Sequence, residues 1–217
     1  MASACQPPTI GVTVPVLEEE PALSAVVLVE GRSDRLAVEA LARRRAKSPA
    51  GAGPLDGVEL RELDGITNLR KALTALRGTS ARVLGLYDAA ERRYVQRVLA
   101  GLGMLDDAGR GAQGTPDMDP LEPLGFFGCE RDLEDEVIRA AGAELVLEAL
   151  DPRERARFRR FQRQPAQRVR SIEEQLHRFA GTAAGRKSRF AADVIDAVPL
   201  ERTPATLNRL LDRVGDR

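Results

Sequence analysis

Acidic residues stand at the points where apolar runs of the sequence stop. Glu30 ends the run 24–29, and Asp34 comes four residues later. Asp88 ends a second run, 82–87, and Glu134 follows a weaker run at 124–128. Carboxylate oxygens are the ligands that hard cations take, and several must converge because each alone holds Mg²⁺ weakly. The pattern predicts an acidic site for a hard cation such as Mg²⁺.

The apolar runs have the features of buried strands. The segment 24–29 is continuous, apolar and β-branched, as in a strand buried on both faces, and 58–63, 82–87 and 124–128 are further candidates. Helical spacing separates them over 33–45, 66–76 and 90–102. This alternation predicts an α/β fold with a mostly parallel four-stranded sheet. Catalytic groups collect outside the carboxyl ends of such strands, which would bring the carboxylates together.

The chain divides into three parts by composition. Residues 1–22 contain prolines and no amphipathic period, which predicts a flexible tail. Residues 23–130 form the α/β core. Beyond it, residues 131–217 show only helical patterns, at 131–150, 152–162, 166–179, 187–197 and 203–214. We expect a helical extension that packs on or beside the sheet.

Charge is segregated although the formal net charge is +0. Residues 117–136 hold eight acidic residues and one basic residue, whereas 151–189 hold twelve basic and four acidic ones. An acidic cluster suits divalent cations and a basic stretch suits phosphate backbones. An ordinary solvated surface is the alternative for each.

Composition excludes several kinds of site. The single histidine, His177, argues against catalysis by several imidazoles and is expected on a helix surface. Cys5 and Cys129 lie far apart, which argues against a disulfide framework or a cysteine metal site. No apolar run reaches the roughly 18 residues that cross a bilayer, so we expect a cytoplasmic protein with no membrane partner.

Five short motifs, taken in order, resemble the TOPRIM domain of topoisomerases, primases and several nucleases, and most closely its version in OLD-family nucleases. They are Val-Glu-Gly-x-x-Asp at 29–34, Gly-x-x-Asn at 65–68, Leu-Tyr-Asp at 86–88, Leu-Glu at 133–134 and a lysine segment at 185–191. The first is weakly specific alone, but the ordered set is much stronger. The resemblance covers about residues 24 to 200.

The resemblance assigns roles to individual residues. It implies that Glu30 is a general acid or base, or a metal ligand, and that Asp88 binds Mg²⁺. Asp34 and Glu134 would complete one or two metal sites, and Lys187 would lie near the scissile phosphate. The family usually has Asp-x-Asp after the third strand, whereas this chain has Ala90 at the second position and Glu91 after it. Glu91 is the candidate replacement ligand.

The resemblance implies a metal-dependent endonuclease or phosphodiesterase that acts on DNA. The alternative is a non-catalytic TOPRIM scaffold that binds nucleic acid or a protein, which Ala90 favours. A primase is disfavoured because no zinc-binding or polymerase region accompanies the core. OLD nucleases usually join this domain to an ATPase, so a separate ATPase partner and a homodimer both stay open.

Single residues also have plain structural interpretations. Glu30 could belong to a polar turn, Asp34 could be an acid of a first helical turn that the helix dipole stabilises, and Asp88 could cap a helix. Asn68 could cap the next helix or fix the loop beside Glu30. Only the order of the motifs favours function.

Overall fold

The computed structural model describes residues 23–46, 55–105, 119–182 and 184–216. The segment 1–22, expected to be a tail, lies outside the described residues, and so does Cys5. The same holds for the side chains of residues 184–187, which include Lys187.

A four-stranded sheet forms the centre of the fold, in the order β2-β1-β3-β4, and every neighbouring pair is parallel. The strands are β1 (Ala25–Val29), β2 (Val58–Glu62), β3 (Arg82–Tyr87) and β4 (Phe126–Gly128). Val27 of β1 lies opposite Leu60 of β2 and Leu84 of β3. The predicted α/β class and parallel sheet are confirmed. All four strands therefore end at the same edge of the sheet.

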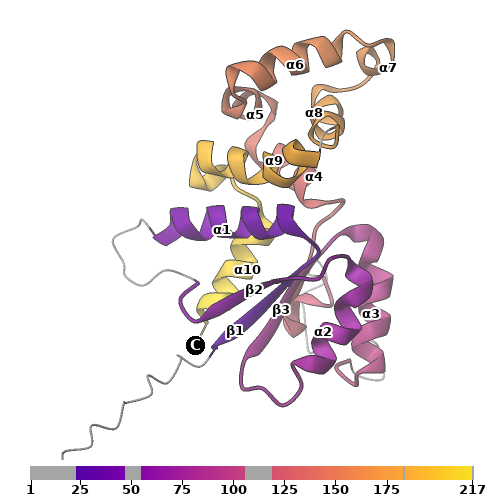
Figure 1. Ribbon diagram of the computed structural model, residues 1–217, viewed down its shortest axis with the longest axis vertical. Coiled ribbons are helices and arrows are strands. Elements are labelled where there is room, and N and C mark those ends of the chain that lie inside the picture. The colour runs from indigo at the N-terminus through magenta and orange to yellow at the C-terminus, as the bar shows by residue number, and fades with distance from the viewer. Residues whose placement is uncertain (1–22, 47–54, 106–118, 183, 217) are drawn as a thin grey trace, which may run out of the picture.

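Helices cover both faces of this sheet (Figure 1). Successive residues of β1 point to opposite faces, so Val26 packs with α2 (Leu69–Ala75) and α3 (Arg92–Gly101), while Val27 packs with α1 (Arg32–Ala46) and α10 (Ala205–Gly215). All five β1 residues are buried. Full burial of each Val or Leu contributes roughly 1.5–3 kcal/mol, which explains why this strand is apolar throughout.

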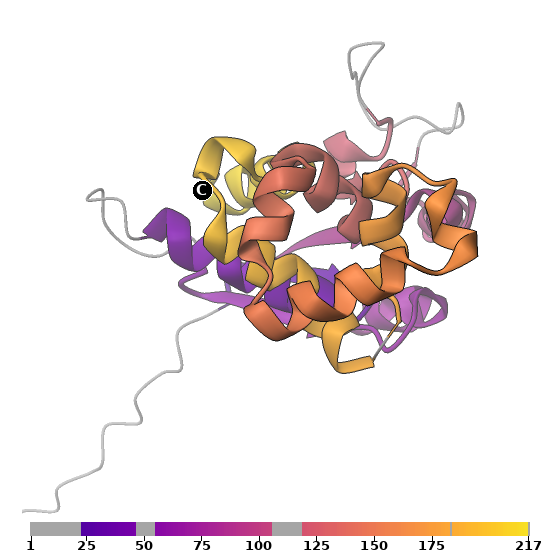
Figure 2. The same ribbon diagram turned by 90° about the horizontal axis from the view of Figure 1, so that it is seen from above.

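The remaining helices build outward from α1 (Figures 1 and 2). They are α4 (Leu133–Ala141), α5 (Ala143–Ala149), α6 (Pro152–Gln162), α7 (Pro165–Arg168), α8 (Ile172–Ala180) and α9 (Ala184–Ala197). One apolar cluster continues from Val27 in the sheet to Phe158 in α6. The helical extension is thus joined to the sheet by a shared core.

Two predicted helices are wrong in their extent. The helix predicted over 131–150 is divided into α4 and α5, because Gly142 has a φ of 82° that ends the first helix. The helix predicted over 166–179 is divided into α7 and α8; Ser171 caps α8 by accepting from the Glu174 N–H at 3.2 Å. An apolar period of 3.6 residues does not indicate where one helix ends and the next begins.

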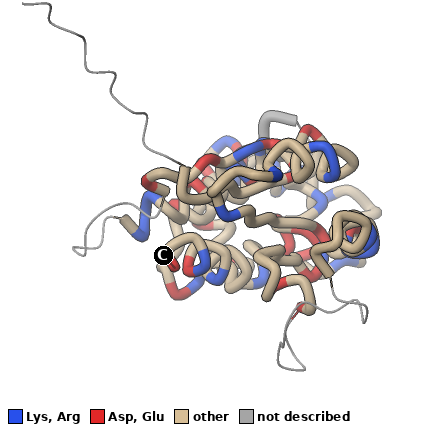
Figure 3. Tube along the Cα trace, turned by 90° about the horizontal axis from the view of Figure 1, so that it is seen from below, with Lys and Arg blue, Asp and Glu red and all other residues tan. Residues whose placement is uncertain are grey.

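Short 3₁₀ helices mark four further boundaries: η1 (Ile66–Asn68), η2 (Ala89–Glu91), η3 (Glu122–Leu124) and η4 (Leu200–Arg202). The strand predicted from residue 124 begins later, at Phe126, since Gly125 has a φ of 87°. None of the described helices is both long and apolar enough to span a membrane. Seen from below, acidic and basic residues are interspersed along the described chain (Figure 3).

Candidate active site

Glu30 and Asp34 lie where β1 turns into α1. Glu30 is the first residue after the strand, and Asp34 lies in the first turn of the helix. The Asp34 carboxylate accepts a hydrogen bond of 3.1 Å from the Gly31 N–H. This bond satisfies a backbone donor near the helix start and holds the Asp34 side chain beside Glu30. Both acids are partly buried.

Asp88 and Glu91 lie at the end of β3. Asp88 stands immediately before η2, yet its carboxylate makes no capping hydrogen bond with any described backbone N–H. Capping therefore does not account for this aspartate. Glu91 is partly buried, and its Oε2 has no hydrogen-bond partner among the described residues. Ala90 is exposed, so Glu91, and not position 90, directs its side chain inward.

Glu134 reaches the same region from the first turn of α4 and is 9% exposed. Asp132 caps this helix by accepting from the Asp135 N–H at 2.8 Å. The other acids nearby have different partners: Glu136 accepts from the Glu130 N–H at 3.0 Å, and Glu130 pairs with Arg139. Of this acidic group, Glu134 is the residue that lines the cavity described next.

A cavity of about 510 Å³ brings the five predicted carboxylates together. Its lining includes all the acids proposed from sequence as metal ligands: Glu30, Asp34, Asp88, Glu91 and Glu134. It lies at the carboxyl ends of β1 and β3, where the chain order changes direction in the sheet. Ligands of open parallel sheets bind at this kind of position. The strand order thus explains why acids 104 positions apart in the sequence share one cavity.

The electrostatics of the cavity follow from burial and like charge. Burial and the neighbouring carboxylates, first Asp34 and then Asp132, Glu91 and Glu30, raise the pKa of Asp88 to about 8. Burial, followed by the Glu30 carboxylate, also raises the pKa of Glu91. The cavity therefore carries more negative charge than its surroundings compensate. A divalent cation or bound protons would relieve the repulsion.

The donor set has the chemistry of a hard-cation site, since every candidate ligand is a carboxylate. In their present side-chain conformations, however, no three Asp, Glu, His or Cys residues of the described ranges are arranged to hold one metal ion. Coordination would require the glutamates to rotate. Coordination would give the buried Oε2 of Glu91 a partner that it lacks among the described residues.

Lys187 belongs to α9, but its side chain is not among those described. Its neighbour Ser188 lines the carboxylate cavity. The lysine segment 185–191 therefore contributes one described residue, Ser188, to the wall of the cavity. Whether the ammonium group contacts a phosphate stays a prediction.

The structure decides between the two roles that the sequence left open for Asn68. The Asn68 amide donates a hydrogen bond of 2.8 Å to the carbonyl oxygen of Leu63 and so closes the loop between them. Gly65, within this loop, donates its N–H to the Glu30 carbonyl oxygen at 3.1 Å. Asn68 thus fixes the loop beside Glu30, and its side chain makes no capping hydrogen bond to the described helix start. Asp64 in this loop has a φ of 53°, which few residues other than glycine adopt.

His177 is not the surface residue expected from sequence. Its Nε2 lies 2.7 Å from Oδ2 of Asp132, and the side chain is 17% exposed. Since Asp132 caps α4, this contact connects α8 to the helix that carries Glu134. A lone histidine in a helical period gives no signal of such a contact.

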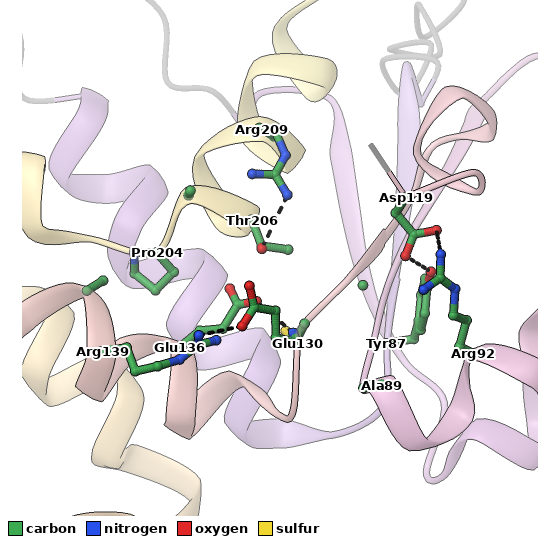
Figure 4. Close-up of a pocket in the computed structure, with 14 residues that line it drawn as sticks. Tyr87, Ala89, Arg92, Asp119, Glu130, Glu136, Arg139, Pro204, Thr206 and Arg209 are labelled. Carbon is green, nitrogen blue, oxygen red and sulfur yellow. Dashed lines mark hydrogen bonds and ion pairs between the residues drawn. The ribbon is translucent and has the colours of Figure 1, made fainter. Parts of the chain in front are cut away.

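A second, larger cavity of about 780 Å³ is lined in part by residues of the β4–α4 connection, among them Cys129 and Glu130 (Figure 4). Arg92, Arg139 and Arg209 line it, and each is paired: with Asp119 at 3.3 Å, with Asp135 at 2.9 Å and with Glu122, respectively. The Tyr87 hydroxyl also lies 2.7 Å from Asp119. Because its charges are mutually compensated, this cavity has less need of a ligand than the carboxylate cavity.

No protein-family model matches the sequence, and no curated protein does either. Solved structures do match. The C-terminal region of the Burkholderia pseudomallei OLD protein superposes with a TM-score of 0.61 at 19% identity, covering 89% of this chain and 98% of that one. This chain has an OLD-like TOPRIM fold. 

The C-terminal region of the Xanthomonas campestris pv. campestris OLD protein gives the same result in two structures. Their TM-scores are 0.59 and 0.57 at 24% and 25% identity, and each match covers 89% of this chain. The matches cover 95% and 92% of the Xanthomonas chains. The structural similarity to the OLD C-terminal regions therefore extends over both the sheet and the helical extension.

Proposed function

We propose that this OLD-like chain is a metal-dependent nuclease that hydrolyses phosphodiester bonds in DNA. The observation that carries the proposal is the convergence of Glu30, Asp34, Asp88, Glu91 and Glu134 on one cavity. The raised pKa of Asp88 supports it, because uncompensated carboxylates are typical of a cation site. The donor set fits one or two Mg²⁺ or Mn²⁺ ions, which when bound would polarise a phosphoryl oxygen and lower the pKa of a water molecule.

Side chains of the protein would transfer the protons during hydrolysis. The Glu30 carboxylate lies close enough to Glu91 to raise the pKa of Glu91, after the larger effect of burial. Glu30, which lines the cavity, would accept a proton from the attacking water or donate one to the leaving oxygen. Lys187, next to the cavity-lining Ser188, would offset the charge that develops on the phosphate.

A non-catalytic scaffold is the second candidate, and one observation favours it. Ala90 replaces the usual aspartate, and no three described donors are arranged for a metal as they stand. In that case Asp88 and Glu91, whose pKa values are raised, would hold protons, and the chain would bind DNA or a protein without cleaving it.

Supercoiled plasmid distinguishes the two. With Mg²⁺ or Mn²⁺ the wild-type chain should nick or cut it, and Glu30→Gln should abolish cleavage. Glu130→Gln is the matched control, because Glu130 follows the neighbouring strand β4 but is 76% exposed and pairs with Arg139. Cleavage that survives chelation, or that Glu30→Gln leaves intact, would refute the nuclease.

Calorimetric titration with Mg²⁺ tests whether Glu91 replaces the aspartate that is usual in the family at position 90. Glu91→Gln and Asp88→Asn should each weaken binding by roughly ten-fold or more, because loss even of a residue that supports a metal ligand usually costs that much. Ala90→Asp should change it less, since position 90 is exposed. Tighter binding by Ala90→Asp together with no effect of Glu91→Gln would show that Glu91 is not the replacement ligand.

A further inference from the structure

The end of the molecule farthest from the sheet carries a concentrated positive charge. We call residues 151–170, comprising α6, α7 and the residues that follow, the basic cap. It contains eight arginines against two acidic residues. In Figures 1 and 2 the cap forms the outermost layer of the helical extension. None of the helices that line the carboxylate cavity belongs to it.

The outward charge of the cap is largely uncompensated. Arg157 pairs with Glu154, and Asp151 is occupied in capping α6 through the Arg153 and Glu154 N–H groups. In contrast, Arg159, Arg160 and Arg163 are exposed, and no carboxylate of the described ranges forms an ion pair with them. These three differ from the arginines of the larger cavity, which all have acidic partners.

Aromatic packing fixes the direction of these three arginines. Phe158 is 1% exposed, and its ring centroid lies 5.2 Å from that of Phe179 in α8. Phe161 packs on the same ring at 5.6 Å. At about 100° per residue, Arg159, Arg160 and the C-cap Arg163 are each turned by roughly 100° or more from both rings, although Arg159 also lines a small cavity beside Phe158. The buried Phe158 ring is also unavailable to stack on bases.

We propose that Arg159, Arg160 and Arg163 form a docking surface for the phosphate backbone of duplex DNA. The proposal rests on the proposed function for the identity of the polyanion. Guanidinium groups match phosphate geometry with two parallel hydrogen bonds. An anionic membrane fits less well, because Val169 is the only large apolar side chain exposed among the cap's described residues, whereas membrane anchors need an apolar face.

The contact is with phosphates alone, so it is independent of base sequence. Its role is to hold the duplex by the helical extension while a phosphodiester bond occupies the carboxylate cavity. Binding should accordingly weaken steeply with salt, by about 0.9 in log–log slope for each phosphate contacted.

The test is binding of a fluorescent 30-base-pair duplex, of any sequence, followed by anisotropy at several salt concentrations without divalent cations. The cap variant Arg159→Gln, Arg160→Gln, Arg163→Gln should reduce the slope by roughly 2 to 3. The control removes the same charge elsewhere: Arg43→Gln, Arg77→Gln and Arg213→Gln lie on exposed parts of α1, the end of α2 and α10. It should reduce the slope by less than about 1.

Equal losses in the cap and control variants, or none in the cap variant, would overturn the docking surface. Tighter wild-type binding to phosphatidylglycerol vesicles than to duplex would also overturn it, in favour of a membrane. If the triple variant does not melt like the wild type by circular dichroism, the three single variants replace it. Each should lower the slope by about 1, and three unchanged slopes would refute the proposal.

Hydrolysis of bis(p-nitrophenyl) phosphate by the wild type separates this proposal from the nuclease. Hydrolysis without duplex binding would refute DNA docking on the basic cap and would leave the proposed hydrolytic activity supported. Duplex binding that depends on the three arginines of the basic cap, without hydrolysis, would support the docking surface and refute the proposed nuclease activity.

Discussion

Replacing Asp88 by asparagine should stabilise the metal-free protein at alkaline pH. The amide keeps the shape of the side chain and removes a charge that four neighbouring carboxylates oppose. The native pKa of about 8 exceeds the ordinary 3.8, so stability is fully present below pH 3.8 and is lost as pH rises towards 8. The full difference would correspond to about 6 kcal/mol. Since the carboxyl is only partly buried, solvent screening reduces the expected gain to roughly 2–3 kcal/mol.

The assay is thermal unfolding followed by circular dichroism, with EDTA, at pH 8.5 and pH 4. For a chain of this size the gain corresponds to a rise of about 5–10 °C in the Tm of Asp88→Asn at pH 8.5. At pH 4 the gain should fall to about 0.5 kcal/mol. Glu130→Gln, which alters an exposed acid, should change stability by less than about 1 kcal/mol at either pH. A gain of the same size at both pH values, or none at pH 8.5, would refute the repulsion assigned to the cavity.

Three further outcomes are expected. Calorimetry should show Mg²⁺ affinity rising between pH 6 and 8, by up to about ten-fold per pH unit, because the cation must displace the proton that the raised pKa of Asp88 retains; a flat profile would contradict this. Gly85→Ala should cost about 1–3 kcal/mol in thermal unfolding, since its Cβ would lie 2.7 Å from the Phe126 ring, whereas Gly215→Ala, with nothing within 4 Å, should cost less than 0.5 kcal/mol or so. His177→Ala should lower the free energy of unfolding by about 1–2 kcal/mol through loss of the Asp132 contact, and His177→Gln, which keeps a donor, by less; equal losses would show that the hydrogen bond is not the cause.

Local patterns predicted the elements well where one physical signal dominated. The apolar run of β1 and the alternation of strands and helices were sufficient for the parallel sheet. They failed where a single residue ended a periodic segment. Gly142 divides a helix because its φ of 82° is incompatible with helix continuation, yet the apolar period runs through it unchanged.

The candidate site shows the same division. Glu30 and Asp88 could be predicted because each directly follows a strand whose end the sequence marks, and Asp34 because it lies one helical turn beyond Glu30. The inward direction of Glu91 could not, because it depends on η2, a 3₁₀ turn that places Ala90 outside and Glu91 inside. The His177–Asp132 contact spans 45 positions and has no local signature.

The sequence by itself determined which residues could do chemistry: carboxylates at strand ends, one histidine, and arginines concentrated in residues 151–170. Only the tertiary structure decided which of them act together. Strand order placed the ends of β1 and β3 side by side and so gathered five acids in one cavity. Packing of Phe158 turned three arginines outward. The physical reason is that side-chain charge is a property of each residue, whereas burial and proximity, which raise the pKa of Asp88, are properties of the packed chain.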